Sequence, residues 1–127
     1  MVDAFAPLLK KSLNIPRVVN VTSGAGSISM RLDPQAMGYA MKSVEYRAGK
    51  AALNMISACQ AIEHGGEKFK LYLFCPGFTV SNLGPYNKKE HSAKPTSEGA
   101  EPIVGILRGE RDEEHGGFLH ADGQYPW

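Results

Sequence analysis

The sequence predicts a mixed α/β domain with a parallel sheet of three strands and their helices. Helical and strand patterns alternate along the 127 residues in the order helix, strand, helix, strand, helix, strand. The strands are short apolar runs, and the segments between them are long enough for right-handed crossovers.

The first predicted helix is the stretch AFAPLLKKS, with an apolar face at Phe5, Leu8 and Leu9 and a basic end that suits the helix dipole. The stretch NIP ends it. Residues 17–23, RVVNVTS, are β-branched and almost continuously apolar, which predicts a strand covered on both faces. GAGS then predicts a turn, and residues 27–43 after it are polar and interrupted by proline and glycine, so we expect a loop without a helix there.

Residues 44–64 predict a long helix that stops at two glycines. Its apolar residues recur at positions 48, 52, 55, 59 and 62, and this stripe is either core or an oligomer face. Residues 69–75 form the second strand, closed by Pro76 and Gly77. A loop of roughly 20 residues follows, and loops of that length are usually functional lids or disordered.

The last third of the chain predicts a short helix capped by Thr96 or Ser97, with Glu98 in its first turn, and then a terminal strand within GGFLHADGQYPW. The single cysteines Cys59 and Cys75 lie in apolar surroundings, which favours buried thiols in a reducing, cytoplasmic setting.

The composition excludes several classes of function. A formal charge of +1 gives no reason to expect a nucleic acid or an anionic membrane as partner. No apolar run is long enough to span a membrane, and the N-terminal stretch lacks the features of a secretory leader. Two histidines near acidic residues, His115 and His120, fit no metal-binding motif, so we expect no metal site.

Three features fall at one end of the predicted sheet. Ser23 follows the first strand, Tyr46 and Lys50 lie on the first turns of the next helix, and PGFTVS follows the second strand. Ligands of open α/β sheets bind at the carboxyl ends of the strands. A lysine one helical turn from a tyrosine stabilises the phenolate, and a serine beside them can orient a carbonyl group. Carbonyl/alcohol redox chemistry needs this trio together with a hydride-carrying cofactor.

The residues RVVNVTSGAGSI, Tyr46-Arg-Ala-Gly-Lys50 and CPGFTVSNL, in this order, resemble the short-chain dehydrogenases/reductases. The tail GGFLHADGQYPW is similar to the last strand of carbonyl-reductase-like members, particularly fungal ones. The resemblance covers essentially the whole chain. It implies the last three strands and helices of a doubly wound, Rossmann-like parallel sheet whose N-terminal nucleotide-binding half is absent.

The resemblance also implies residue roles. Tyr46 matches the general acid/base, Lys50 the residue that assists it and holds the nicotinamide ribose, and Ser23 the hydroxyl that orients the carbonyl group. The cofactor-binding positions are Tyr46 and Lys50 together with Pro76, Gly77, Thr79 and Ser81. The implied cofactor is NADP, with NAD possible, and the implied substrate is a small carbonyl compound or alcohol.

The sequence differs from the family pattern at two places and lacks one of the family's motifs. Gly49 stands where the motif usually has serine, and Ser23 lies 23 residues before Tyr46, more than is usual. The glycine-rich turn that binds the dinucleotide pyrophosphate is missing, so residues 1–127 resemble the C-terminal catalytic half of the domain.

This absence predicts an unpaired strand edge at residues 18–22, weak or no NADPH binding, and no activity of the chain alone. We expect a homo-oligomer or pairing with another chain. The alternatives are a non-enzymatic module that pairs with a full-length relative, and a chain whose first methionine is internal to a longer protein.

Overall fold

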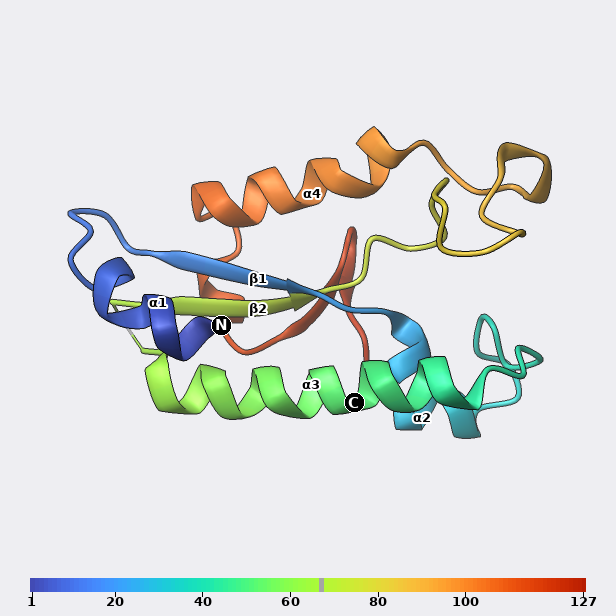
Figure 1. Cartoon of the computed structure of the whole chain (residues 1–127), viewed down its shortest axis with the longest axis horizontal. Coiled ribbons are helices and arrows are strands. Elements are labelled where there is room, and N and C mark those ends of the chain that lie inside the picture. Colours follow the sequence, from blue (N-terminus) through green and yellow to red (C-terminus); the bar gives the residue numbers. More distant parts are fainter. Residues whose placement is uncertain (67) are drawn as a thin grey trace.

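The computed structural model describes residues 1–66 and 68–127. Figure 1 shows three layers, in which helices α1 and α3 cover one face of a sheet and helix α4 covers the other. The main elements are α1 (Val2–Leu9), β1 (Arg17–Val21), α2 (Ile28–Leu32), α3 (Val44–His64), β2 (Lys70–Phe74), α4 (Thr96–Arg108), β3 (Phe118–His120) and β4 (Gly123–Gln124). Three single 3-10 turns complete the set: η1 (Gly24–Gly26), η2 (Lys89–His91) and η3 (Asp112–Glu114). The predicted α/β class is confirmed.

The sheet contains one strand more than the sequence predicted. Its order is β1-β2-β3-β4, in which β1, β2 and β3 are parallel and β4 returns antiparallel to β3. The fourth strand arises because the Ala-Asp-Gly turn closes a hairpin within the terminal stretch. β1 lies at the end of this order, so within the described residues it pairs on one side only, as predicted.

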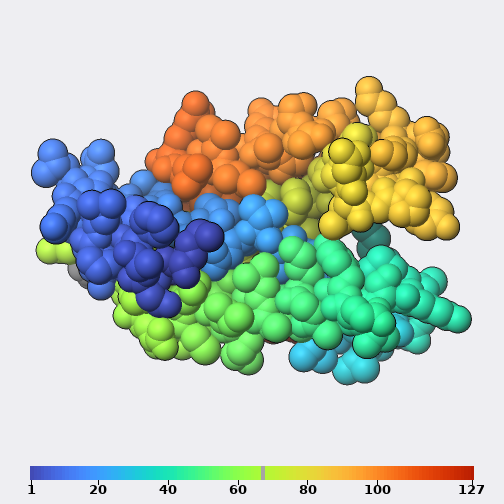
Figure 2. Space-filling view, in the orientation of Figure 1, coloured from blue at the N-terminus to red at the C-terminus, as the bar shows by residue number. Residues whose placement is uncertain are grey.

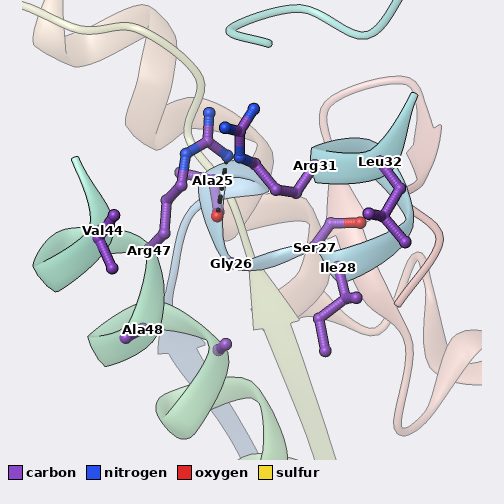
Figure 3. Close-up of a pocket in the computed structure, with 10 residues that line it drawn as sticks. Ala25, Gly26, Ser27, Ile28, Arg31, Leu32, Val44, Arg47 and Ala48 are labelled. Carbon is purple, nitrogen blue, oxygen red and sulfur yellow. Dashed lines mark hydrogen bonds between the residues drawn. The ribbon is translucent and has the colours of Figure 1, made fainter. Parts of the chain in front are cut away.

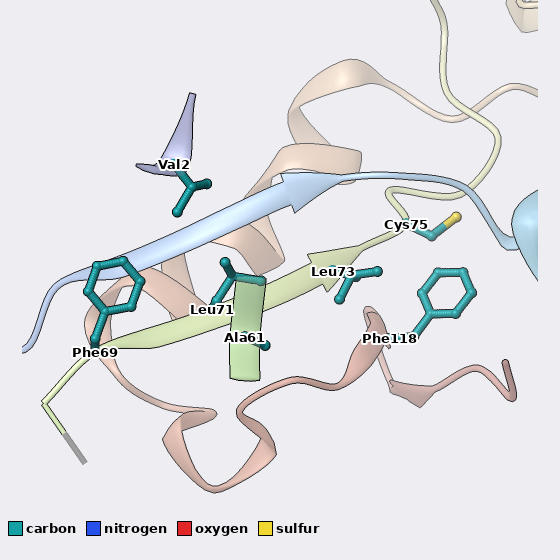
Figure 4. Packing of buried hydrophobic residues seen from close by; sticks show 7 residues of the cluster. All are labelled: Val2, Ala61, Phe69, Leu71, Leu73, Cys75 and Phe118. Atoms are coloured by element: carbon teal, nitrogen blue, oxygen red, sulfur yellow. The ribbon is translucent and has the colours of Figure 1, made fainter. Parts of the chain in front are cut away.

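β2 forms the centre of the core, because both of its faces are covered. Leu71 and Leu73 point to the α1 and α3 side, where they join Val2, Ala61, Phe69, Cys75 and Phe118 (Figure 4). Tyr72 and Phe74 point to α4, where they meet Ile106 and Leu119. β1, predicted to be covered on both faces, is only half-buried, and Val21 is 49% exposed.

The predicted apolar face of α1 is wrong for two of its three residues, since only Leu9 packs against the core. The helix buries Val2 and Ala6, whereas Phe5 and Leu8 are exposed. A short helix that is apolar on most sides does not specify which side faces the sheet, and small residues allow the closer approach.

The bounds of α3 agree with the prediction, but its predicted apolar stripe faces outward, so it is not core. Met55 and Ile62 are exposed, and so is Cys59, which was expected to be a buried thiol. The side facing the sheet carries Asn54, Ser57 and Ala61. Polar side chains occur there because β1 supplies partners; for example, Asn20 Nδ2 donates to Ser57 Oγ at 2.8 Å.

Residues 27–43, predicted to be free of helix, contain the short helix α2. Ser27 caps it by accepting a hydrogen bond from the backbone of Met30 at 3.1 Å. The end of the chain also anchors it, since Ser27 Oγ donates to the Pro126 carbonyl at 2.6 Å and the Ser29 backbone to the Trp127 oxygen at 2.9 Å. Contacts between such distant residues leave no local signal in the sequence.

The start of α4 also differs from the prediction. Pro95 precedes the helix and no side chain caps it, because the Thr96 hydroxyl instead donates to the Val80 carbonyl at 3.1 Å. The long loop before α4 is pinned by a parallel bridge between Thr79 and Lys94. Among the described residues, no helix combines the length and the apolar composition that crossing a membrane requires.

At the amino end of β1, Arg17 forms a bidentate ion pair with Asp112. The guanidinium donates to the two carboxylate oxygens at 2.7 and 2.6 Å, and the Tyr72 hydroxyl donates to the same carboxylate at 2.9 Å. The hydrogen bonds from Arg17 lower the pKa of Asp112 to about 2. Burial raises the pKa of Tyr72.

Candidate active site

Ser23 lies two residues beyond the end of β1, as predicted. Its backbone is extended, and its side-chain oxygen accepts a hydrogen bond from the Ala25 backbone at 3.2 Å, which begins η1. The side chain is half-buried. Because its oxygen accepts this bond, the hydroxyl hydrogen remains free to donate to a ligand.

Tyr46 and Lys50 lie on one face of the first turns of α3. The ammonium nitrogen of Lys50 stands 5.9 Å from the centre of the Tyr46 ring, within range of a cation–π interaction. The same nitrogen donates to the Val21 carbonyl at 3.3 Å. Lys50 therefore connects the tyrosine to the carboxyl end of β1, where the Ser23 turn begins.

A buried contact fixes α3 against this turn. Thr22, the residue before Ser23, donates its hydroxyl to the Asn54 side-chain oxygen at 2.5 Å, and both residues are only 3% exposed. Gly26 permits the close approach, because a Cβ there would stand 2.7 Å from the Lys50 carbonyl carbon. The spacing between the serine turn and the lysine is thus set by packing.

The Pro76–Gly77 turn after β2 adjoins the serine turn through one sulfur atom. Cys75 is buried, and its Sγ accepts from the Gly24 backbone at 3.1 Å and from the Gly77 backbone at 3.4 Å. Gly77 has a φ of +77°, a conformation that side chains rarely adopt. The two turns that follow β1 and β2 are therefore joined at the same end of the sheet.

Thr79 and Ser81 lie farther along the loop after β2. The Thr79 carbonyl accepts from Asn87 at 3.2 Å, and the Ser81 hydroxyl oxygen accepts from the Leu83 backbone at 3.3 Å. Figure 2 shows the surface to be indented between this loop and the first turns of α3. The loop thus borders the end of the sheet that carries the other candidate residues.

Three residues of this region were not expected to contribute. Asn54 and Cys75 hold the turns together, and the Lys94 ammonium lies beside Gly77, 3.6 Å from where a Cβ would stand. For Asn54 the only signal in the sequence is its position one turn after Lys50. The contributions of Cys75 and Lys94 depend on loop geometry, which the sequence does not reveal.

Comparison with curated proteins identifies fungal relatives, although no protein-family model matches the sequence. The short-chain dehydrogenase anuI of Penicillium roqueforti is 40% identical over an alignment of 108 positions that covers 82% of this chain and 41% of that protein. The short-chain dehydrogenase/reductase tropE of Talaromyces stipitatus is 30% identical over a gapped alignment of 138 positions that covers 98% of this chain and 52% of that protein. The chain spans about half the length of the curated relatives it matches.

Solved structures of carbonyl reductases are also similar to this chain. The carbonyl reductase from chicken fatty liver, solved with NADPH bound, has a TM-score of 0.76 and 26% identity, with 99% of this chain and 51% of that chain covered. The carbonyl reductase Sniffer of D. melanogaster has a TM-score of 0.70 and 20% identity, with 99% of this chain and 51% of that chain covered. The resemblance indicated by the motifs is therefore confirmed, and the α/β fold is similar to that of carbonyl reductases.

Proposed function

We propose, from its similarity to short-chain dehydrogenases/reductases, that this chain is the C-terminal catalytic half of an oxidoreductase that interconverts carbonyl compounds and alcohols with NADP(H). The observation that carries the proposal is the position of Lys50. Its ammonium contacts the Tyr46 ring and the Val21 carbonyl at the edge of the serine turn.

Each side chain has a distinct task in this proposal. The Tyr46 hydroxyl gives a proton to the carbonyl oxygen during reduction and takes it back during oxidation. The Lys50 ammonium stabilises the phenolate that remains. The Ser23 hydroxyl, whose oxygen already accepts from the Ala25 backbone, donates to the carbonyl oxygen and orients it.

The residues present fit the nicotinamide end of the cofactor but not its pyrophosphate. Gly77 keeps the loop backbone open, and Pro76, Thr79, Ser81 and Lys50 supply the remaining positions around the nicotinamide and its ribose. The bound nicotinamide supplies the hydride. The SGAGS turn leads into the five-residue helix α2, whose Ser27 hydroxyl is occupied by Met30 and Pro126.

This partial fit leads to an expectation for the chain alone. Among the described residues, no glycine-rich turn leads into a helix start that is free to receive the pyrophosphate. We therefore expect the chain to bind NADPH weakly or not at all and to reduce no carbonyl compound. The choice of NADP over NAD rests on the NADPH found in the chicken carbonyl reductase. The substrate is a small carbonyl compound or alcohol.

A second candidate function is a non-enzymatic module that pairs with a second copy or with a full-length relative. Two features of the described residues favour it. The outer edge of β1 has no partner strand, and the outward side of α3 is apolar, with Met55, Ile56 and Ile62 53–85% exposed. Such a module copurifies with its partner. The Tyr46→Phe variant should copurify equally well, because pairing does not use the tyrosine hydroxyl.

The test uses fragments of the cofactor. Backbone amide signals of the isotopically labelled chain are followed by NMR during titration with reduced nicotinamide mononucleotide and, separately, with adenosine 2′,5′-bisphosphate. We expect the nicotinamide fragment to shift the signals of Lys50 and Gly77, with a Kd of roughly millimolar, and the adenosine fragment to shift neither.

Lys50→Met should abolish the response, whereas Lys10→Met, an exposed lysine at the far end of the sheet, should leave it unchanged. If neither fragment perturbs Lys50 or Gly77, the catalytic proposal is wrong. Tight binding of whole NADPH with turnover of a carbonyl substrate would instead overturn only the expected inactivity of the chain alone.

A further inference from the structure

A groove of about 270 Å³ lies between α2 and the first turns of α3 (Figure 3). Its walls are mainly apolar and include Ile28 and Leu32 of α2 and Val44 and Ala48 of α3. We call it the α2–α3 groove. Ile28, Leu32 and Val44 are 66–76% exposed, so the structure presents a cluster of aliphatic side chains to solvent at this point.

The α2–α3 groove is distinct from the candidate active site. Successive residues of an α-helix are rotated by about 100°, so Ala48 lies about 200° around α3 from Tyr46. Tyr46 and Lys50 share the side of α3 that faces the end of β1, whereas Val44 and Ala48 face α2. A ligand in the groove therefore does not contact the catalytic pair.

Two guanidinium groups stand at one rim of the groove, and Figure 3 shows them side by side. Arg47 donates to three carbonyl oxygens, those of Ala25 at 3.3 Å, Gly38 at 2.5 Å and Met41 at 3.3 Å. These contacts satisfy N–H groups but do not neutralise the charge.

Arg31 donates to the Tyr39 carbonyl at 2.8 Å and stacks over the Tyr39 ring at 5.3 Å. In the part of the chain described here, no carboxylate lies within 4.0 Å of Arg31 or Arg47. The acidic residue nearest in sequence to Arg31, Asp33, accepts instead from the Gln35 backbone at 2.9 Å. Two adjacent cations without a counter-ion repel each other, and a bound anion would relieve that repulsion.

We propose that the α2–α3 groove binds a small amphipathic carboxylate, with its aliphatic part against Ile28, Leu32 and Val44 and its carboxylate between Arg31 and Arg47. The positive charge of the rim favours an anionic ligand, and the apolar walls favour one with an aliphatic chain. The volume of about 270 Å³ lies just below the range of drug-sized pockets, so an acid of about eight carbons is a suitable probe.

The experiment titrates the labelled chain with sodium octanoate and follows the backbone amide signals by NMR. Octylammonium, which has the same chain length and the opposite charge, and acetate, which lacks the chain, serve as comparison ligands. We expect octanoate to shift the signals of Gly26, Ile28 and Ala48 in a saturable way, and neither comparison ligand to do so. Since the readout is binding alone, it does not depend on the proposed catalytic activity.

Matched variants locate the site. Arg31→Gln should weaken octanoate binding by about five- to tenfold, whereas Arg108→Gln, an exposed arginine at the end of α4, should not change it. Leu32→Glu should abolish binding by placing a carboxylate in the groove, and Leu107→Glu on α4 should not. Both positions are exposed, so the fold persists.

Equal binding of octanoate and octylammonium would overturn the proposal, because the groove would then be merely apolar. Shifts confined to the outer stripe of α3, around Met55, would also overturn it. So would an Arg31→Gln variant that binds octanoate as tightly as the unchanged chain.

Discussion

Replacing Asp112 by asparagine removes the counter-ion of Arg17 while keeping the size of the side chain. The two side chains are only 16% and 23% exposed, so the unpaired guanidinium stays largely shielded from water. The variant should therefore be less stable than the unchanged chain, and the loss should depend on pH.

The size of the loss follows from the pKa of Asp112, which is 3.8 in the unfolded reference and about 2 in the fold. That difference corresponds to about 2 kcal/mol of stability at pH 7. Because the pKa is lower in the folded chain, the contribution is complete above pH 5 and is lost as the pH falls from about 4 towards 2. At pH 3 about 1 kcal/mol remains.

Urea unfolding followed by circular dichroism at pH 7 and pH 3 measures the effect. Asp112→Asn should lower the urea midpoint at pH 7 by about 1 M, since urea slopes for small domains are about 1–3 kcal/mol per M. At pH 3 the gap to the unchanged chain should be about half as large. Asp122→Asn, with the same charge change in the exposed β3–β4 turn, is the control. Equal losses in both variants, or a gap that does not shrink at pH 3, would refute the reasoning.

Three further predictions concern the candidate active site. Gly26→Ala should lower the unfolding midpoint, because the added methyl group would stand 2.7 Å from the backbone of α3. Gly49→Ala is the matched control: no atom lies near that position, and the variant should raise the free energy of unfolding by about 0.5–1 kcal/mol. Thr22→Val and Asn54→Leu should each lower the free energy of unfolding in urea by about 1–3 kcal/mol. The double variant should lose less than the sum of the two. Additive losses would mean that the 2.5 Å contact between the two side chains contributes nothing to stability. In the native chain Cys59 should react quickly with a thiol reagent and Cys75 only on unfolding, and similar rates would contradict the burial of Cys75.

The bounds of α3 and the places of β1, β2 and α4 were predictable from sequence, because they depend on local patterns, whereas α2 and β4 were not predicted. The limits of α3 follow from its periodic apolar residues and from the glycines that end it. The burial of β2 follows from its continuous apolar run, KLYLF. The positions of Ser23, Tyr46 and Lys50 follow from the same elements, since the residues after parallel strands and the start of the connecting helix meet at one end of a sheet.

What the sequence did not reveal depends on contacts between distant segments. α3 has an aliphatic stripe and a side with Asn54 and Ser57, and hydropathy favours burial of the stripe. The structure buries the other side, because small and polar residues fit closely against β1 and its end, where Ser57 and the side-chain oxygen of Asn54 accept hydrogen bonds. Likewise, α2 exists where no helical period is present, since its anchors lie at the opposite end of the chain.

That anchoring has a consequence for the order of folding. Ser27 and Ser29 bond to Pro126 and Trp127, residues separated from them by 99 and 98 positions. Contacts of such long range form late, and during synthesis the N-terminal segments emerge first. α2 and the groove beside it therefore depend on residues about 100 positions away, and we expect them to form only once residues 126 and 127 are in place.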